Sequence, residues 1–187
     1  MRERENSMKE QISIRSATVA DAAGILEIYR YYVEHTAISF EYDVPTLEEF
    51  ERRIAATLDG GFPYLVAVKD GEICGYSYAG PFIRRAAYDW SAELTIYLRN
   101  DCKKQGIGRM LYEEMERLLQ KKGIRNLYAC IGLPEVEDEY LNKNSAQFHE
   151  HMGFSLVGVF HSCGRKFNRW YHMIWMEKMI GEHGENV

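Results

Sequence analysis

The fold of this chain is decided by the segment Ser91-Ala92-Glu93-Leu94-Thr95-Ile96-Tyr97-Leu98, which runs directly into Arg99-Asn100-Asp101-Cys102-Lys103-Lys104-Gln105-Gly106-Ile107-Gly108. The first part is apolar and rich in strand-forming residues, so it predicts a strand over 91–98. From 106 to 122, apolar residues recur at helical spacing: Ile107, Met110, Leu111, Met115, Leu118 and Leu119. The segment therefore predicts a strand, a glycine-containing loop and a long amphipathic helix.

The start of this helix is suited to binding an anion. Gly106 and Gly108 let the backbone approach a ligand closely, and the free N–H groups of a first helical turn attract phosphate. Four cations gather around the loop although the chain has a net charge of -5: Arg99, Lys103, Lys104 and Arg109. From spacing alone, a loop that only tightens the strand–helix turn explains the glycines equally well.

Two other phosphate-binding loops do not match this segment. A P-loop has Lys and then Ser or Thr after its last glycine, whereas Arg109-Met110 follow Gly108 here. A dinucleotide-binding loop has three spaced glycines and an acid about 20 residues further on. Here the third glycine is missing and 126–128 contain no acid.

The rest of the chain alternates strands and helices around this segment. A strand over 12–15 precedes two helices, which begin at the N-caps Thr18 and Thr46; Gly60-Gly61 ends the second helix. Further strands are predicted over 64–69, 73–82, 126–131, 156–161 and 171–178, and a short helix over 145–152. The order β-α-α-β-β-β-α-β-α-β-β predicts an α+β domain with a mixed, mostly antiparallel central sheet flanked by helices. We expect a single domain over 11–180, with flexible tails at 1–10 and 181–187.

Composition limits the classes of function. With 46% hydrophobic and 27% charged residues, the 187-residue chain has the composition of a folded globular domain. Its net charge of -5 argues against a nucleic-acid partner, and no apolar run approaches the roughly 20 residues of a membrane helix. The first ten residues lack the apolar region of a signal peptide, so we expect a cytoplasmic protein with reduced cysteines. Neither the four cysteines nor His149-Glu150-His151 has metal-ligand spacing, so no metal is expected.

Two motifs in this sequence resemble those of the GNAT superfamily of N-acetyltransferases. Residues Lys103-Lys104-Gln105-Gly106-Ile107-Gly108 are similar to its pyrophosphate-binding loop, Gln/Arg-x-x-Gly-x-Gly/Ala, with Lys103 at the Gln/Arg position. The second motif is Asn142-x-x-Ser145-x-x-Phe148-His149-x-x-x-Gly153-Phe154. The resemblance extends over 12–179 and implies the GNAT fold, with acetyl-CoA as co-substrate.

Within this superfamily, further segments resemble the phosphinothricin and methionine sulfoximine N-acetyltransferases. They are residues 78–82, 87–93, 131–134 and 164–170. This closer resemblance implies a small-molecule amine as the acceptor and a homodimer as the assembly. Three features depart from the relatives: an acidic insertion at 135–141, His172 in place of Asp, and Ile83 in place of Lys.

Acetyl transfer needs a neutral amine, because an ammonium ion has no lone pair with which to attack. Glu93 is the candidate general base, since its apolar neighbours predict an interior strand and burial raises the pKa of a carboxylate. The resemblance places the family's catalytic Glu at this position; otherwise Glu93 is a surface acid or the partner of an Arg. His149 stands where many relatives carry a Tyr that acts as general acid; otherwise it packs beside the ligand without a chemical role.

The resemblance also implies two sets of binding residues. The acetyl-CoA set is Ile96, Tyr97, Leu98, Lys103, Lys104, Gln105, Gly106, Ile107, Gly108, Arg109, Asn142 and Ser145. The acceptor set is Phe40, Arg84, Arg85, Tyr88, Glu93, Leu94 and Thr95. Backbone N–H groups near 96–98 would also stabilise the oxyanion. Alternatively Asn142 caps a helix, and Arg84 and Arg85 are a solvated pair in a loop.

The sequence therefore predicts an N-acetyltransferase that acetylates the α-amino group of a small amino-acid analogue by direct transfer. Methionine sulfone and methionine sulfoximine are the first candidates, and phosphinothricin is the second. One alternative is an acetyltransferase of a polyamine, an aminoglycoside or a protein N-terminus. Others are a non-catalytic acyl-CoA-binding sensor, and a partner-binding module that uses the 135–141 insertion.

Overall fold

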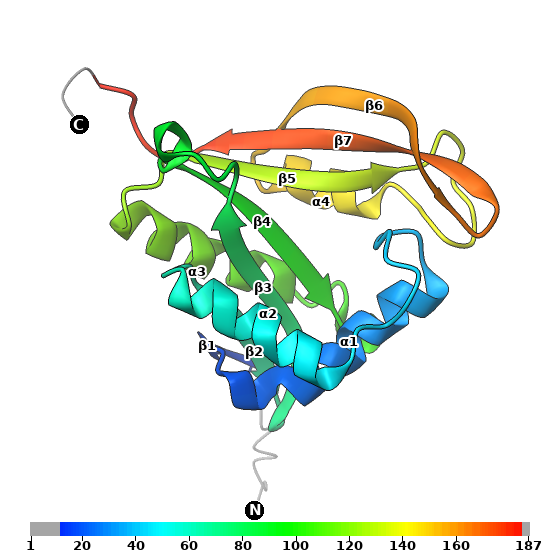
Figure 1. Ribbon diagram of the computed structural model, residues 1–187, viewed down its shortest axis with the longest axis horizontal. Coiled ribbons are helices and arrows are strands. Elements are labelled where there is room, and N and C mark those ends of the chain that lie inside the picture. Colours follow the sequence, from blue (N-terminus) through cyan, green and yellow to red (C-terminus); the bar gives the residue numbers. More distant parts are fainter. Residues whose placement is uncertain (1–11, 185–187) are drawn as a thin grey trace, which may run out of the picture.

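The computed structural model describes residues 12–184, so the expected tail at 1–10 and the last three residues of the other tail lie outside the described part. Within it, seven strands form one sheet in the order β1-β2-β3-β4-β5-β7-β6 (Figure 1). They are β1 Ile12–Ser16, β2 Tyr64–Lys69, β3 Glu72–Pro81, β4 Ser91–Leu98, β5 Asn126–Leu133, β6 Ser155–Lys166 and β7 Arg169–Met179. Every neighbouring pair is antiparallel except β4–β5, which confirms the predicted mixed, mostly antiparallel sheet.

Helices cover both faces of the sheet. On one face lie α1 (Ala22–His35) and α2 (Leu47–Asp59), and on the other lie α3 (Ile107–Lys121) and α4 (Asn144–His151) (Figure 1). The predicted cap Thr46 is confirmed, because its hydroxyl accepts the Glu49 N–H at 3.2 Å. Thr18 instead caps a short 3₁₀ turn, Val19–Asp21, that leads into α1. No helix in the part of the chain described is long and apolar enough to cross a membrane.

The two strands at the centre of the sheet separate soon after they begin. Parallel pairing joins β4 to β5 only from Ser91 to Glu93. Beyond Glu93, β4 remains paired with β3 as far as Leu98, while its other edge has no strand neighbour among residues 12–184. The sheet is thereby divided into a β1–β4 half and a β5–β7–β6 half, which diverge in Figure 1.

The last hairpin is longer than the sequence predicted. β6 continues to Lys166 and β7 begins at Arg169, whereas the pattern indicated strands over 156–161 and 171–178. Phe167 and Asn168 have φ values of 50° and 61°, as a type I′ hairpin turn requires. An irregularity between Phe160 and Gly164 interrupts the alternation of inward and outward residues along β6. For this reason the two-residue periodicity of the sequence did not predict that the strand continues.

Candidate active site

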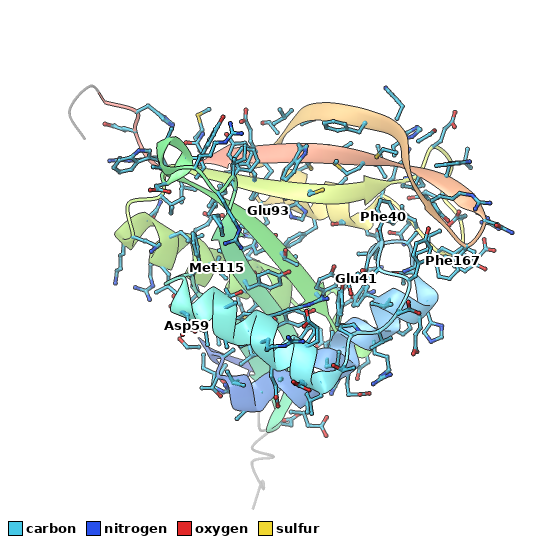
Figure 2. The ribbon with its side chains drawn as sticks, viewed as in Figure 1. Phe40, Glu41, Asp59, Glu93, Met115 and Phe167 are labelled. Carbon is cyan, nitrogen blue, oxygen red and sulfur yellow. The ribbon has the colours of Figure 1, made fainter. Side chains whose placement is uncertain are left out.

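A cavity of about 400 Å³ occupies the opening between β4 and β5. Its walls come from the loop after α1 at 38–41, from β4 at 93–97 and from β5 at 129–132. Predicted residues from the catalytic, cofactor and acceptor sets line it together: Phe40, Glu93, Leu94, Thr95, Ile96, Tyr97, Ser145 and His149. Figure 2 shows Glu93 on β4, and Phe40 and Glu41 on the α1 side of the opening. We call this space the catalytic cavity.

Glu93 is the acidic group at the point where the strands separate. It is the last β4 residue paired with β5, opposite Tyr128. Its side chain is half-buried, and this loss of hydration raises the pKa of the carboxyl above its usual value. Within residues 12–184 the carboxylate has no hydrogen-bond or ion-pair partner. It is therefore free to accept a proton from a group in the catalytic cavity.

The free edge of β4 continues from Glu93 toward the start of α3. Ile96 and Tyr97 line the catalytic cavity along this edge. Leu98 does not line it, and the Leu98 carbonyl accepts the Tyr32 hydroxyl at 2.5 Å. The unpaired edge of β4, which the sequence predicted to bind the cofactor, thus ends at the hydrogen bond between Tyr32 and Leu98.

The loop between β4 and α3 presents uncapped helical N–H groups. Lys104 and Gly106 have φ values of 61° and 81°, and no side chain caps α3 at Gly106. Gln105 fixes the loop, since its side-chain amide donates to the Asp101 carbonyl at 3.0 Å. Burial lowers the pKa of Lys103, whose ammonium lies 5.3 Å from the centre of the Tyr32 ring. The predicted set Lys103, Lys104, Gln105, Gly106, Ile107, Gly108 and Arg109 lies outside the catalytic cavity, at and after the far end of β4.

Gly108 has a packing role in addition to its place in the loop. A Cβ atom built on it would lie 3.0 Å from the Phe148 ring of α4. The missing side chain lets α3 and α4 approach closely, which brings the two sequence motifs side by side. The predicted binding of an anion at this helix start therefore has support from both geometry and charge.

His149 is a neutral, buried imidazole in the wall of the catalytic cavity. Its Nδ1 is 2.7 Å from the Ser145 carbonyl, which can only accept, so Nδ1 carries the hydrogen. Its Nε2 therefore accepts the Tyr112 hydroxyl at 2.9 Å. Burial lowers the pKa of His149 to about 4, so the ring holds no second proton near neutral pH. This arrangement does not favour His149 as an acid that gives up its own proton.

The start of α4 carries the other predicted cofactor residues. The Asn142 side-chain oxygen accepts the Asn144 N–H at 3.0 Å, and the Glu137 carboxylate accepts the Lys143 N–H at 2.8 Å. The Asn142 oxygen thus satisfies one helix-terminal N–H, although the N-cap residue of α4 is Lys143, and the exposed Asn142 amide N–H₂ keeps its hydrogens free.

The predicted acceptor residues do not all come together. Phe40 lines the catalytic cavity. Arg84, Arg85 and Tyr88 lie in the exposed loop between β3 and β4 and do not line it. Arg84 lines a second cavity on the α1/α2 face, which shares Tyr29, Glu41 and Tyr78 with the catalytic cavity.

A sequence model of the Acetyltransferase (GNAT) domain matches residues 14–175 of this chain. The chain belongs to the GNAT family of acetyltransferases. A phosphinothricin N-acetyltransferase of Streptomyces viridochromogenes is 32% identical over 86% of this chain and 83% of its own length. An L-methionine sulfoximine/L-methionine sulfone acetyltransferase of Pseudomonas paraeruginosa is 30% identical over 88% of this chain and 92% of its own.

The fold is shared with solved GNAT structures. A crystal structure of a phosphinothricin acetyltransferase from Sinorhizobium meliloti, in complex with AcCoA, superposes with a TM-score of 0.84. It is 30% identical and covers 94% of this chain and 95% of its own. The predicted GNAT fold is confirmed, and the protein is an N-acetyltransferase of this family.

Several residues of this GNAT site were not predicted from the sequence. Tyr29, Tyr78 and Tyr112 line the catalytic cavity, but the sequence assigned none of them to the site, because tyrosines on the buried faces of their elements have the pattern of core residues. Glu41 also lines it, next to the predicted Phe40. Only the excess of tyrosine, 13 residues in 187, pointed toward an aromatic pocket.

Proposed function

We propose that this protein transfers the acetyl group of acetyl-CoA to the α-amino group of a small amino-acid analogue. Methionine sulfone and methionine sulfoximine are the first candidates, and phosphinothricin is the second. The observation that carries the proposal is the half-buried, unpaired Glu93 at the point where β4 and β5 separate. The names of the relatives support this acceptor class.

In this mechanism Glu93 acts as the general base. The acceptor arrives as an ammonium ion, and the Glu93 carboxylate accepts one of its protons, directly or through a water molecule. The raised pKa of Glu93 makes the carboxylate a stronger base than an exposed glutamate. The neutral amine nitrogen then bonds to the acetyl carbon, the carbon–sulfur bond to CoA breaks, and the nitrogen gives its surplus proton to the CoA thiolate or to water. Transfer is direct, without a covalent acetyl-enzyme.

The residues present fit acetyl-CoA. The uncapped N–H groups at Gly106 and the cations Lys103, Lys104 and Arg109 suit a pyrophosphate. The unpaired edge of β4 at 96–97 supplies backbone groups for the pantetheine arm and for the developing oxyanion. Asn142, just before α4, and Ser145, in its first turn, reach the same ligand in this proposal.

The departing thiolate needs little assistance. A thiol has a pKa of about 8.5, so its anion is a good leaving group that water can protonate. The neutral His149 holds the Tyr112 hydroxyl beside the catalytic cavity. The general-acid role of His149 stays a prediction, as do the homodimer and the cytoplasmic location.

Two rival functions share the fold. An acetyltransferase of a polyamine or an aminoglycoside would favour an acidic pocket, whereas Arg84 and Arg85 place positive charge in the loop before β4, and Arg84 lines the second cavity. An acyl-CoA-binding sensor would retain CoA affinity but would not depend on Glu93.

A thiol-release assay with acetyl-CoA tests the proposal. The amine panel is methionine sulfone, methionine sulfoximine, phosphinothricin, an aminoglycoside and spermidine. We expect saturable release with at least one of the first three, and about a 100-fold lower kcat in Glu93→Gln with acetyl-CoA affinity retained. The rate should rise with pH through the raised pKa of Glu93, because only the carboxylate is a base. Release only with cationic amines would contradict the acceptor class, and near-normal turnover in Glu93→Gln would contradict the base.

A further inference from the structure

The second cavity has a volume of about 640 Å³ and has no role in the mechanism above. It lies on the α1/α2 face of the sheet, and six aromatic side chains line it: Tyr29, Phe50, Phe62, Tyr64, Tyr76 and Tyr78. The Tyr64 ring stacks against two neighbours, at 5.0 Å from Tyr78 and 6.0 Å from Tyr76. A concave space of this size with aromatic walls suits a planar apolar group. We call it the aromatic cavity.

Gly80, in the wall of the aromatic cavity, lies beside Glu93 in the sheet. In the antiparallel β3–β4 pair, Gly80 lies directly opposite Glu93, so both residues face the α1/α2 side. Gly80 lines the aromatic cavity, and a Cβ atom built on it would meet no atom within 4 Å. No side chain at position 80 therefore stands between the general base, which Figure 2 shows on β4, and the aromatic cavity.

One unpaired cation stands at this cavity. Arg53 also lines it, but its guanidinium is bound to Glu41 at 2.7 Å and to Glu49 at 3.1 Å. Arg84 is exposed and has no hydrogen-bond or ion-pair partner among residues 12–184. Its guanidinium is therefore free to bind a carboxylate from a ligand.

We propose that the aromatic cavity is a side-chain subsite for the acceptor, and that it takes aromatic α-amino acids. The amino group lies at Glu93, the side chain passes over Gly80 into the aromatic cavity, and the carboxylate pairs with Arg84. This inference rests on the proposed function and widens its acceptor class from sulfone-type amino acids to aromatic ones. An aromatic ring gains contact area with the stacked tyrosines, whereas a sulfone or phosphinate would lose hydration there.

The test is calorimetric titration of L-tryptophan into the protein in the presence of CoA. Gly80→Val should weaken tryptophan binding by about tenfold or more, because the new side chain fills the opening. Valine suits a strand, and the space at position 80 is open, so the variant should fold. Gly158→Val is the matched control: Gly158 lies in β6, a Cβ there also meets no atom within 4 Å, and it lines neither cavity. Absence of tryptophan binding to the unmodified protein, or equal affinity in both variants, overturns the proposal.

A second pair of measurements tests the carboxylate contact. Tryptamine carries the same ring and amine as tryptophan but lacks the carboxylate. We expect the unmodified protein to prefer tryptophan over tryptamine, and Arg84→Gln to abolish that preference while keeping the binding of tryptamine. Equal affinities in the unmodified protein overturn the assignment of Arg84.

Turnover separates this inference from the proposed function. Acetylation of methionine sulfone without any binding of tryptophan overturns the aromatic subsite and leaves the proposed function standing. Binding of tryptophan that depends on Gly80, without acetylation of any amine, supports the subsite and overturns the proposed function.

Discussion

At the level of single residues, His149 shows how burial fixes a protonation state. The side chain is 3% exposed, both ring nitrogens are hydrogen-bonded, and its pKa is lowered to about 4 from the usual 6.5. The unfolded chain, which exposes this ring, takes up a proton near pH 6.5. Between these two pH values the unfolded state binds more protons than the folded state, so folding becomes less favourable as pH falls.

This difference predicts how stability changes with pH. Between pH 6.5 and 4, the free energy of unfolding should fall by about 3 kcal/mol more in the unmodified protein than in His149→Gln. Urea unfolding at a series of pH values measures the difference. His151→Gln, which removes an exposed histidine of the same helix, is the control and should follow the unmodified protein. If the free energy of unfolding falls equally with pH in the unmodified protein and in His149→Gln, then His149 is not a buried, neutral imidazole in the folded protein.

Residues of the candidate site also differ in whether the sequence alone could predict them. Glu93 could be predicted because an acid on an apolar strand is unusual and because the surrounding motif resembles a known family. Gly80 could not, because its importance comes from the residue opposite it on β4. Cross-strand register depends on how two segments pair, and neither segment encodes that pairing by itself.

At the level of elements, the acidic insertion at 135–141 is docked against the β6–β7 hairpin. The Arg169 guanidinium binds Asp138 at 2.9 Å and Glu139 at 2.8 Å. The Tyr140 ring stacks on Phe167 with centroids 4.1 Å apart. The sequence did not predict this docking, because the partners that hold the insertion lie about 30 residues further along the chain.

Arg169→Ala should release the insertion. Two ion pairs and the contact with the Tyr140 ring would be lost together, so proteolytic cleavage within 135–141 should become about threefold faster or more. Limited proteolysis followed by mass spectrometry locates the cuts. Arg165→Ala is the matched control, since Arg165 lies on the same hairpin and contacts Asn168 and Trp170 instead. Equal cleavage rates in the two variants would show that the insertion is held by its other contacts.

At the level of the whole molecule, contacts at both ends of the opening between β4 and β5 connect the two halves of the protein. At the closed end, three residue pairs join β4 to β5. At the open end, the β6–β7 hairpin contacts the loop that follows α1. The Lys166 ammonium, 3% exposed, donates to the carbonyls of Val33 at 2.7 Å, Thr36 at 2.9 Å and Ser39 at 2.7 Å. Those carbonyls belong to the end of α1 and to the loop that carries Phe40 into the catalytic cavity.

Lys166 therefore links global stability to the shape of the site. Lys166→Met keeps the apolar stem but leaves three carbonyls without their donor, which should lower the free energy of unfolding by about 2–4 kcal/mol. Because the loop at 36–41 then loses its anchor, the KM for the acceptor should rise while acetyl-CoA affinity changes little. Urea unfolding and steady-state kinetics measure the two effects.

Lys178→Met is the control: it breaks a single ion pair with Glu116, between β7 and α3, and should cost about 1 kcal/mol without changing the acceptor KM. If the two variants lose equal stability and keep the same acceptor KM, the open end of the cleft is held by contacts other than Lys166.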